Sequence, residues 1–105
     1  MTDCIFCKII NGDFNTEFVY ENEHFVVFKD INPKAEIHLL VVPRIHVESL
    51  NELNDEVLLG KMMMTIKNVT KELGIKSYKT LINTGKDAGQ EVFHLHTHIL
   101  AGRIN

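Results

Sequence analysis

Residues 94–100 alternate between two kinds of side chain, and this alternation restricts the backbone that they can adopt. Histidines occupy positions 94, 96 and 98, with Leu95, Thr97 and Ile99 between them. Successive side chains of a β-strand point to opposite faces, so the three imidazoles share one face and the other face can pack. Imidazoles on a solvated strand face can be purely structural. The polar, glycine-containing loop at 83–90 can present backbone donors beside them and favours a reaction surface.

The size and charge of the chain limit what it can be. A chain of 105 residues, 45% of them hydrophobic, is long enough for one core, so we expect a single domain over 1–105. The net charge of −3 and the absence of a lysine or arginine run argue against nucleic-acid binding, although a single nucleotide remains possible. No segment reads as a membrane span or a signal peptide, so we expect a cytoplasmic protein without membrane contact.

Hydrophobic runs and turn signals predict an α+β fold. A short helix is expected over 4–10, a hairpin of strands over 18–20 and 25–28, and a third strand over 37–42. Ser49 and Glu52 form a capping-box pattern for a brief helical turn, and Asp55 can cap a long helix that ends at Leu73 before Gly74. Strands over 78–83 and 92–100 complete the chain. The expected architecture is a five-stranded, largely antiparallel sheet with one long helix and a short N-terminal helix.

The long helix carries one apolar stripe at helical spacing, formed by Leu58, Met62, Ile66, Val69 and Leu73. We expect this stripe to cover one face of the sheet. Met63 and Met64 widen it, and we interpret the methionines as core filling rather than as ligands. A helix this apolar could also pack on a second subunit.

One motif connects the histidine segment to a known family. The pattern His-apolar-His-x-His-apolar-apolar follows Asn83, Gly85, Gly89 and Gln90, and together they resemble the histidine triad (HIT) superfamily of nucleotide hydrolases and transferases. Further matches at 5–10, 28–33 and 42–46 extend the resemblance over nearly the whole chain, and it is closest to the nucleotide-binding Hint branch. The resemblance implies a HIT-like fold and a homodimer in which two subunits join their sheets.

The resemblance also implies roles for three histidines. His96 would be the nucleophile, since a neutral imidazole nitrogen can attack phosphorus and form a covalent nucleotidyl adduct that water then opens. A backbone carbonyl of the same strand would orient its other nitrogen. His98 would contact the phosphate and the leaving-group side. His38 would lie beside the triad, although a histidine inside an apolar strand can also be a satisfied interior residue.

The expected nucleotide site has a base side and a phosphate side. By resemblance, Asp30 would accept the ribose hydroxyls, and an apolar slot would hold a purine, although ordinary core packing explains its phenylalanines equally. The slot residues are Phe6, Ile9, Phe28 and Ile31. The phosphate-side residues are Asn83, Gly89, Gln90, Glu91 and Val92. Glu91 stands where many Hint-type proteins carry a serine, which weakens the transfer of their substrate preference.

Cys4 and Cys7 have the spacing of a zinc-binding pair but supply only half of a tetrahedral site. The resemblance implies that His46 and His94 complete a structural Cys2His2 zinc site. Two unligated thiols are the simpler alternative. A thioredoxin-like redox motif ranks last, since no strand precedes the pair.

These expectations favour an enzyme. We expect a purine nucleotide hydrolase or transferase that cleaves at the α-phosphorus through a nucleotidyl-histidine, as a nucleoside phosphoramidase releasing AMP or GMP. A dinucleoside polyphosphate hydrolase and a nucleotide-binding regulatory protein with little turnover are the alternatives; a purely structural zinc module leaves His96 and His98 unexplained. Because few residues follow the triad segment, from Gly102 to Asn105, we expect little discrimination between amine leaving groups.

Overall fold

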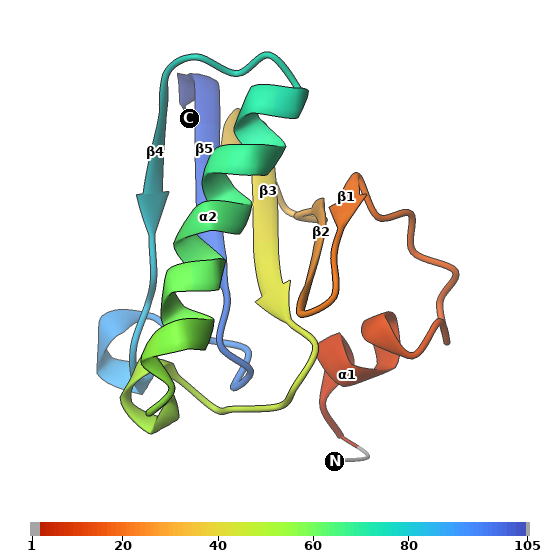
Figure 1. Ribbon diagram of the computed structural model, residues 1–105, viewed down its shortest axis with the longest axis vertical. Coiled ribbons are helices and arrows are strands. Elements are labelled where there is room, and N and C mark those ends of the chain that lie inside the picture. The colour runs from red at the N-terminus through yellow and green to blue at the C-terminus, as the bar shows by residue number, and fades with distance from the viewer. Residues whose placement is uncertain (1–2, 105) are drawn as a thin grey trace.

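Five strands form one antiparallel sheet in the computed structural model, which describes residues 3–104 (Figure 1). Asn105, the last residue of the expected C-terminal segment, lies outside the described residues. The sheet order is β1-β2-β3-β5-β4, and each neighbouring pair is antiparallel. The strands are β1 (Tyr20–Glu21), β2 (Phe25–Lys29), β3 (Ala35–Pro43), β4 (Tyr78–Leu81) and β5 (Thr97–Ile104). The predicted α+β class is confirmed, including the long helix and the short N-terminal helix.

Two cores form because the side chains of the central strands alternate between the faces of the sheet. One core lies under the long helix, and the other lies on the side of the N-terminal helix. The first takes these residues of β2 and β3: Phe25, Val27, Leu39 and Val41. The second takes their neighbours: Val26, Phe28, Leu40 and Val42. The sheet therefore has no solvated face at its centre.

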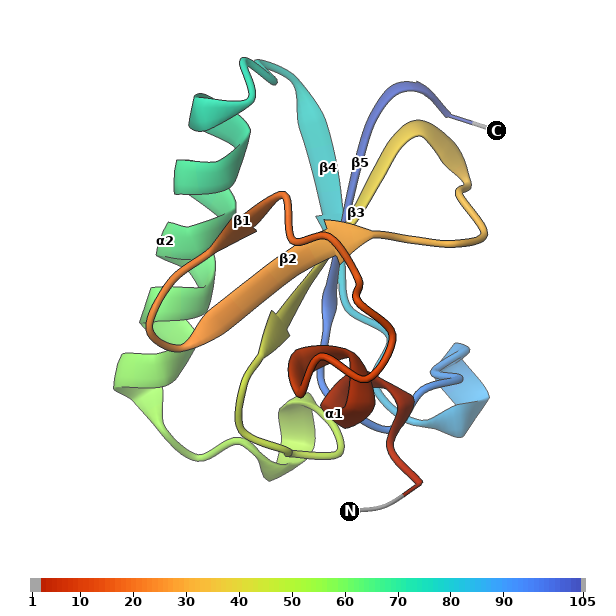
Figure 2. The same cartoon turned by 90° about the vertical axis from the view of Figure 1, so that its right-hand side faces the viewer.

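The long helix α2 (Glu56–Glu72) covers one face of the sheet (Figures 1 and 2). As predicted, Asp55 caps it, accepting a hydrogen bond of 3.0 Å from the N–H of Leu58. Gly74 follows the helix with φ +72°, which a residue with a side chain rarely adopts. A brief 3-10 turn, Leu50–Glu52, precedes the helix where the capping pattern predicted one.

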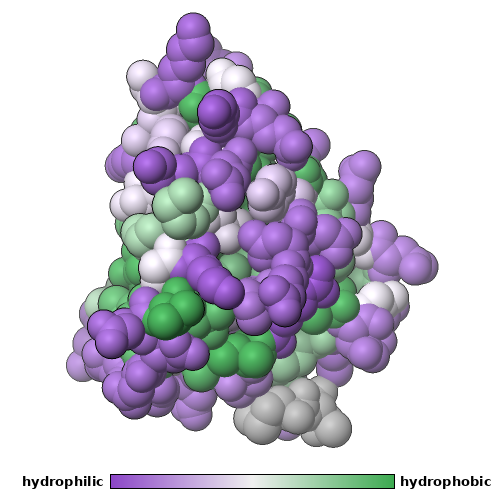
Figure 3. Space-filling view, viewed as in Figure 1, coloured by the Kyte–Doolittle hydropathy of each residue, from purple (hydrophilic) through white to green (hydrophobic). Residues whose placement is uncertain are grey.

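The apolar stripe of α2 is narrower than predicted. Four of its expected members are buried, namely Leu58, Met62, Ile66 and Val69. Met63, Met64 and Leu73 are instead half-exposed, so the expectation that they fill the core is wrong. Adjacent residues lie about 100° apart around a helix, so Met63 and Met64 turn away from the sheet when Met62 faces it. Figure 3 shows this side of the molecule, with apolar surface among mostly hydrophilic side chains.

The N-terminal helix α1 (Ile5–Ile10) packs on the face of the sheet opposite to α2 (Figure 2). Cys4 caps it through its sulfur, which accepts a 3.2 Å hydrogen bond from the N–H of Cys7. Phe6 is the buried residue of this helix, and its ring meets Phe28 edge to face at 5.5 Å. The helix is thereby fixed beside β2 and β3.

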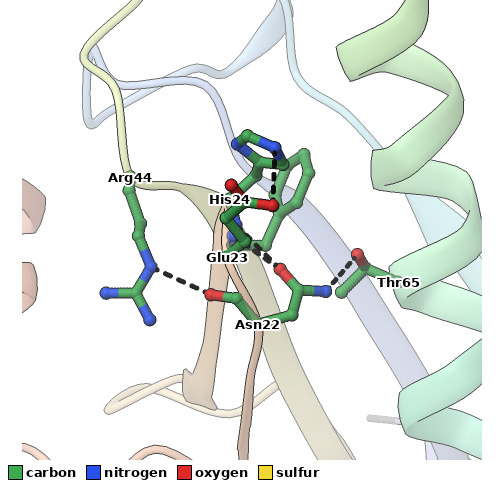
Figure 4. A network of polar contacts seen from close by, with 6 residues as sticks. Asn22, Glu23, His24, Arg44 and Thr65 are labelled. Atoms are coloured by element: carbon green, nitrogen blue, oxygen red, sulfur yellow. Dashed lines mark hydrogen bonds and ion pairs between the residues drawn. The ribbon is translucent and has the colours of Figure 1, made fainter.

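The turn between β1 and β2 is bound to α2 and to the end of β3 by Asn22 (Figure 4). Its side-chain oxygen accepts from the N–H groups of His24 and Phe25, and its Nδ2 donates to Thr65 of α2 at 3.0 Å. Its carbonyl accepts from Arg44 Nε at 3.0 Å. One asparagine therefore holds three segments together.

Several strand boundaries differ from those predicted. The largest correction concerns the last strand, expected over 92–100 and found at Thr97–Ile104. Residues 92–96 do not join the ladder, because the N–H of Leu95 donates to Val47, outside the sheet, at 2.8 Å. The first strand is Tyr20–Glu21 rather than 18–20, and Phe18, before it, packs against the second core. The third strand is longer than 37–42, and the fourth ends at Leu81 instead of Asn83. Among residues 3–104, no helix has the length and apolar character needed to cross a membrane.

Candidate active site and metal centre

The side chains of residues 94–99 alternate between two faces as predicted, although only residues 97–99 lie in β5. Leu95 and Ile99 enter the core under α2, and Thr97 reaches Met62 of that helix. The histidine rings lie on the opposite side, where Phe6 packs edge to face on His94 and His96 at centroid distances of 5.9 and 5.0 Å. The rings of His96 and His98 are 5.0 Å apart. The histidines therefore gather on the face that α1 covers.

His96 is buried and its ring is oriented by the backbone. Its Nδ1 lies 2.7 Å from the carbonyl oxygen of His94, which can only accept, so Nδ1 carries the proton. The Nε2 atom of a neutral His96 then has a free lone pair. Burial lowers the pKa of His96, which keeps the ring neutral near pH 7. An imidazole in this state is a competent nucleophile.

His38 and His98 form a second hydrogen-bonded unit across β3 and β5. The N–H of Lys34 lies 2.9 Å from His38 Nδ1, and His38 Nε2 lies 2.9 Å from His98 Nδ1. Asp30 Oδ2 is 3.3 Å from His38 Nε2. The backbone N–H of Lys34 donates, so His38 carries its proton on Nε2.

Both of these rings are neutral near pH 7. Burial, followed by the neighbouring His96 and His38, lowers the pKa of His98 from 6.5 to about 4. Burial also lowers the pKa of His38, against the opposing effect of Asp30. A neutral His98 offers one N–H donor. Its hydrogen bond to a phosphate would be strengthened by the negative charge of the phosphate, because the ring itself is uncharged.

The residues predicted to bind zinc lie together. The ligand atoms of Cys4, Cys7, His46 and His94 are all within 4.8 Å of one another. The two Nδ1 atoms are 3.3 Å apart, and sulfur–nitrogen distances are 3.2, 3.4 and 3.6 Å. Zinc–ligand bonds of about 2.1 and 2.3 Å give tetrahedral edges of about 3.4 and 3.6 Å for such pairs. The four residues therefore fit a tetrahedral metal ion.

The protonation of His94 agrees with this role. Its Nε2 donates to the carbonyl of Pro43 at 2.8 Å, which leaves the Nδ1 lone pair facing the sulfurs. The cluster of Asp30, His38 and His98 is also close enough for a metal ion. It does not fit one, because the proton on His38 Nε2 occupies the position that a metal bond would need.

Cys7 is a thiol in the absence of a metal ion. Burial, and then the neighbouring Cys4, raises the pKa of Cys7 to about 11. Both cysteines are free of disulfide bonds. A metal ion would displace the Cys7 proton, and the four donors together would supply its binding affinity.

The predicted base-slot residues divide into two groups. Phe6 and Phe28 are buried in the second core and Ile9 packs against it, whereas Ile31 is 90% exposed. Asp30 is fixed in the loop after β2, because its Oδ1 accepts a 2.8 Å hydrogen bond from the N–H of Asn32. Ile31 is thus free to contact a ligand, while the two phenylalanines also serve the fold.

Two predicted phosphate-side residues shape the loop that precedes the histidines. The amide of Gln90 is buried, with its nitrogen donating to the carbonyls of Glu48 and Val92 and its oxygen accepting from Gly85. Asn83 Nδ2 donates to Ala88 at 2.8 Å. Gly89 has φ +88°, which suits glycine at this turn. Phosphate contact by these residues stays a prediction, and the two amide side chains already have structural partners.

Glu91 and Val92 line a hollow of about 330 Å³ beside the Cys–His cluster. Its other lining residues are Asp3, Cys4, Ile5, His46, Glu48 and Phe93. The carboxylates of Asp3, Glu48 and Glu91 would repel a phosphate, so this hollow does not suit the phosphate side of a nucleotide. The predicted contact of Glu91 and Val92 with the nucleotide remains a prediction.

Sequence reasoning missed two backbone groups of the site. They are the N–H of Lys34, which bonds to His38, and the carbonyl of Pro43, which bonds to His94. Every non-proline residue has an N–H and every residue has a carbonyl, so no residue type marks them in a sequence.

Comparison with known proteins agrees with this arrangement. The family described as "Scavenger mRNA decapping enzyme C-term binding" matches residues 3–105. Protein HitA of Neisseria gonorrhoeae is 50% identical over 95% of this chain and 96% of its own length. The chain belongs to the HIT family.

Two solved HIT structures are similar to it throughout. A histidine triad protein from Clostridium difficile has a TM-score of 0.93 and 41% identity, covering 100% of this chain and 95% of that one. A HIT family hydrolase from Legionella pneumophila Philadelphia 1 has a TM-score of 0.90 and 35% identity, covering 96% and 94%.

Proposed function

We propose that this HIT protein hydrolyses nucleotides at the α-phosphorus through a covalent nucleotidyl-His96. The observation that carries this proposal is the hydrogen bond from His96 Nδ1 to the His94 carbonyl, which leaves Nε2 unprotonated on a buried, neutral ring. The similarity to a HIT family hydrolase of Legionella pneumophila supports hydrolysis as the reaction class.

The reaction has two displacements. His96 Nε2 attacks the α-phosphorus, and the bond from phosphorus to the leaving group breaks with its electron pair on the leaving group, which takes a proton from water. The adduct's positive imidazole keeps its Nδ1–H on the His94 carbonyl. Water then attacks the phosphorus, loses a proton, and returns the electron pair to Nε2. Nucleoside monophosphate is released and the enzyme is restored.

His98 would stabilise the charge that develops on the phosphate oxygens. Its ring lies 5.0 Å from that of His96, so a phosphate attacked by one could reach the other. Asp30 would accept the ribose hydroxyls, because a carboxylate is acceptor-only when ionised and its Oδ1 is already fixed by Asn32. Ile31 would contact the base from the solvent side.

The preferred substrate class is a purine nucleoside phosphoramidate, with AMP or GMP as the product. Adenylylated or guanylylated amines suit a site whose three histidines are neutral and supply no positive charge, because the pKa values of all three are lowered. Dinucleoside polyphosphates carry more negative charge and would gain less from these neutral donors.

A zinc ion held by Cys4, Cys7, His46 and His94 would have a structural role. Four protein ligands close the coordination shell, so such an ion would fasten α1 to the segment before β5 and leave no open position for substrate. A cytoplasmic location for the protein also remains our proposal.

One comparison tests the proposed function. Specificity constants should be measured for an adenosine phosphoramidate, its guanosine counterpart and a dinucleoside polyphosphate, together with rapid-quench trapping of a radiolabelled nucleotidyl adduct. We expect the phosphoramidates to have the larger kcat/KM and the adduct to form in the first turnover. Tight nucleotide binding without turnover of any of the three would support a regulatory binding protein instead. A preference for the polyphosphate would overturn the substrate class.

A further inference from the structure

We propose that the backbone N–H of Lys34 is a positioning group that acts through His38 to fix the tautomer of His98, leaving His98 Nε2–H as the donor toward the substrate. The tautomer is independent of what the protein does. Its consequence for turnover rests on the proposed function.

The first step is the hydrogen bond between Lys34 and His38. A backbone N–H cannot accept, so at 2.9 Å it requires a lone pair on His38 Nδ1. His38 is buried in β3, and burial favours its neutral form, which has a single ring proton. That proton must therefore be on Nε2.

The second step is the hydrogen bond from His38 to His98, which determines which nitrogen of His98 carries the proton. His38 Nε2 has two neighbours within reach, His98 Nδ1 at 2.9 Å and Asp30 Oδ2 at 3.3 Å. The carboxylate of Asp30 can only accept when ionised, which agrees with a proton on His38 Nε2. His98 Nδ1 then accepts, and the single proton of a neutral His98 must be on its Nε2.

The two histidines closest to the proposed reaction consequently have opposite tautomers. His96 has its lone pair on Nε2, because its Nδ1–H donates to His94, whereas His98 has its proton on Nε2. One ring can attack phosphorus while the other donates to a phosphate oxygen. The reverse tautomer of His98 would place a lone pair against that oxygen and repel it.

The side chain of Lys34 is exposed, so the proposed role belongs to its backbone. The role of the N–H can therefore be tested separately from that of the side chain, with two proteins that differ only in whether position 34 has an N–H. Lys34→Ala keeps the N–H and loses the side chain. The same position carrying lactic acid, introduced by stop-codon suppression, replaces that N–H with an ester oxygen and otherwise matches the alanine variant.

The direct test is two-dimensional NMR of the ring nitrogens and carbons in protein labelled with ¹⁵N-histidine, at pH 7. In the unmodified protein we expect the Nε2–H form for both His38 and His98 and the Nδ1–H form for His96. Lys34→Ala should retain this assignment. In the ester protein, His38 should move toward the Nδ1–H form and His98 should lose its single Nε2–H form.

Turnover of an adenosine phosphoramidate provides the second readout. We expect kcat of the ester protein to be at least tenfold below that of Lys34→Ala, with KM changed less than about threefold, because the lost donor acts mainly in the transition state. Lys34→Pro, which also lacks the N–H, should behave like the ester protein. If the ester protein does not fold, Lys34→Pro takes its place in both the NMR and the kinetic comparison.

Each outcome is decisive. A Nδ1–H tautomer at His38 or His98 in the unmodified protein would overturn the proposal, as would an unchanged His98 tautomer after removal of the N–H. Altered tautomers with equal kcat in the ester and alanine proteins would remove the positioning role. If the tautomers agree but no nucleotide is turned over by the unmodified protein, the proposed function fails and the tautomer assignment stands.

Discussion

His96 donates its Nδ1–H to the backbone carbonyl of His94 over 2.7 Å, while the ring of His94 faces Cys4 through its own Nδ1 at 3.2 Å. His94 thus serves two sites with different atoms. Its carbonyl orients the proposed nucleophile, and its imidazole completes the proposed metal site. The first contact depends on the backbone path and the second on the residue type.

Replacing the proposed nucleophile should abolish turnover and spare binding. His96→Ala is expected to lower kcat at least 1,000-fold, because the covalent route is lost, while the Kd for AMP changes less than about tenfold. Steady-state kinetics and calorimetric titration measure the two quantities. His24→Ala is a matched control, since His24 is a half-exposed histidine in the β1–β2 turn. Retention of turnover in His96→Ala would show that another group attacks the phosphorus.

Metal content and stability should change together. We expect one zinc per chain by elemental analysis, and chelation should lower the Tm because the ion joins α1 to the segment before β5. Cys7→Ser is the informative variant, since Cys4 also caps α1 and its loss would have two effects. The Tm of Cys7→Ser should be low already and insensitive to chelator. A chelator-insensitive Tm in the unmodified protein would contradict a structural metal.

Acid should destabilise the protein partly through His98. The pKa of His98 falls from 6.5 to about 4 on folding, so the unfolded chain binds more protons between these values. The contribution of neutral His98 to the free energy of unfolding is therefore fully present above about pH 6.5 and is lost as the pH falls through about 4. Thermal unfolding at pH 7.0 and 4.5 should show a Tm decrease that is smaller by several degrees in His98→Asn. Equal decreases in both proteins would mean that His98 ionises as freely in the folded state.

Two glycine substitutions should have opposite effects. Gly102 has φ +71°, and a Cβ there would lie 2.5 Å from Glu36 Oε1, so Gly102→Ala should cost about 1–2 kcal/mol. Gly60 lies within α2 with open space around it, and Gly60→Ala should stabilise by about 0.5–1 kcal/mol. Urea unfolding of both variants measures these differences. A neutral Gly102→Ala would indicate that the end of β5 adapts readily.

We propose a homodimer on the basis of two exposed elements. All four residues of β4 are exposed at the edge of the sheet, and α2 exposes Val57, Met63 and Met64. Light scattering at micromolar concentration should report about 24 kDa, twice the 12.0 kDa of one chain. Met64→Glu should shift the mass toward 12 kDa, whereas Lys76→Glu, outside α2, should not. A 12 kDa species for the unmodified chain would contradict the proposal.

Local patterns predicted the elements better than their ends. The cap at Asp55, the alternation of residues 94–99 and the number of strands follow from periodicity and capping, which are local. The start of β5 is set by a tertiary contact, the hydrogen bond from Leu95 to Val47. A pattern confined to neighbouring residues does not contain that information.

The candidate site shows the same limit. The spacing of Cys4 and Cys7 indicated half of the metal site and the family resemblance added His46 and His94; the fold brings the four ligand atoms together. The amide of Gln90, by contrast, is committed to the carbonyls of Glu48 and Val92, and only the folded loop reveals these partners. Backbone donors such as the N–H of Lys34 have no residue signature at all.

The alternation of side chains within residues 94–99 also determines which insertions, deletions and substitutions this segment can accept. Leu95 and Ile99 reach the core under α2, while the histidines between them reach the opposite face. Insertion or deletion of one residue here would exchange the two sets, placing imidazoles beneath α2 and aliphatic side chains in the site. The aliphatic positions of the segment can therefore exchange with other apolar side chains, whereas the number of residues between its histidines is fixed.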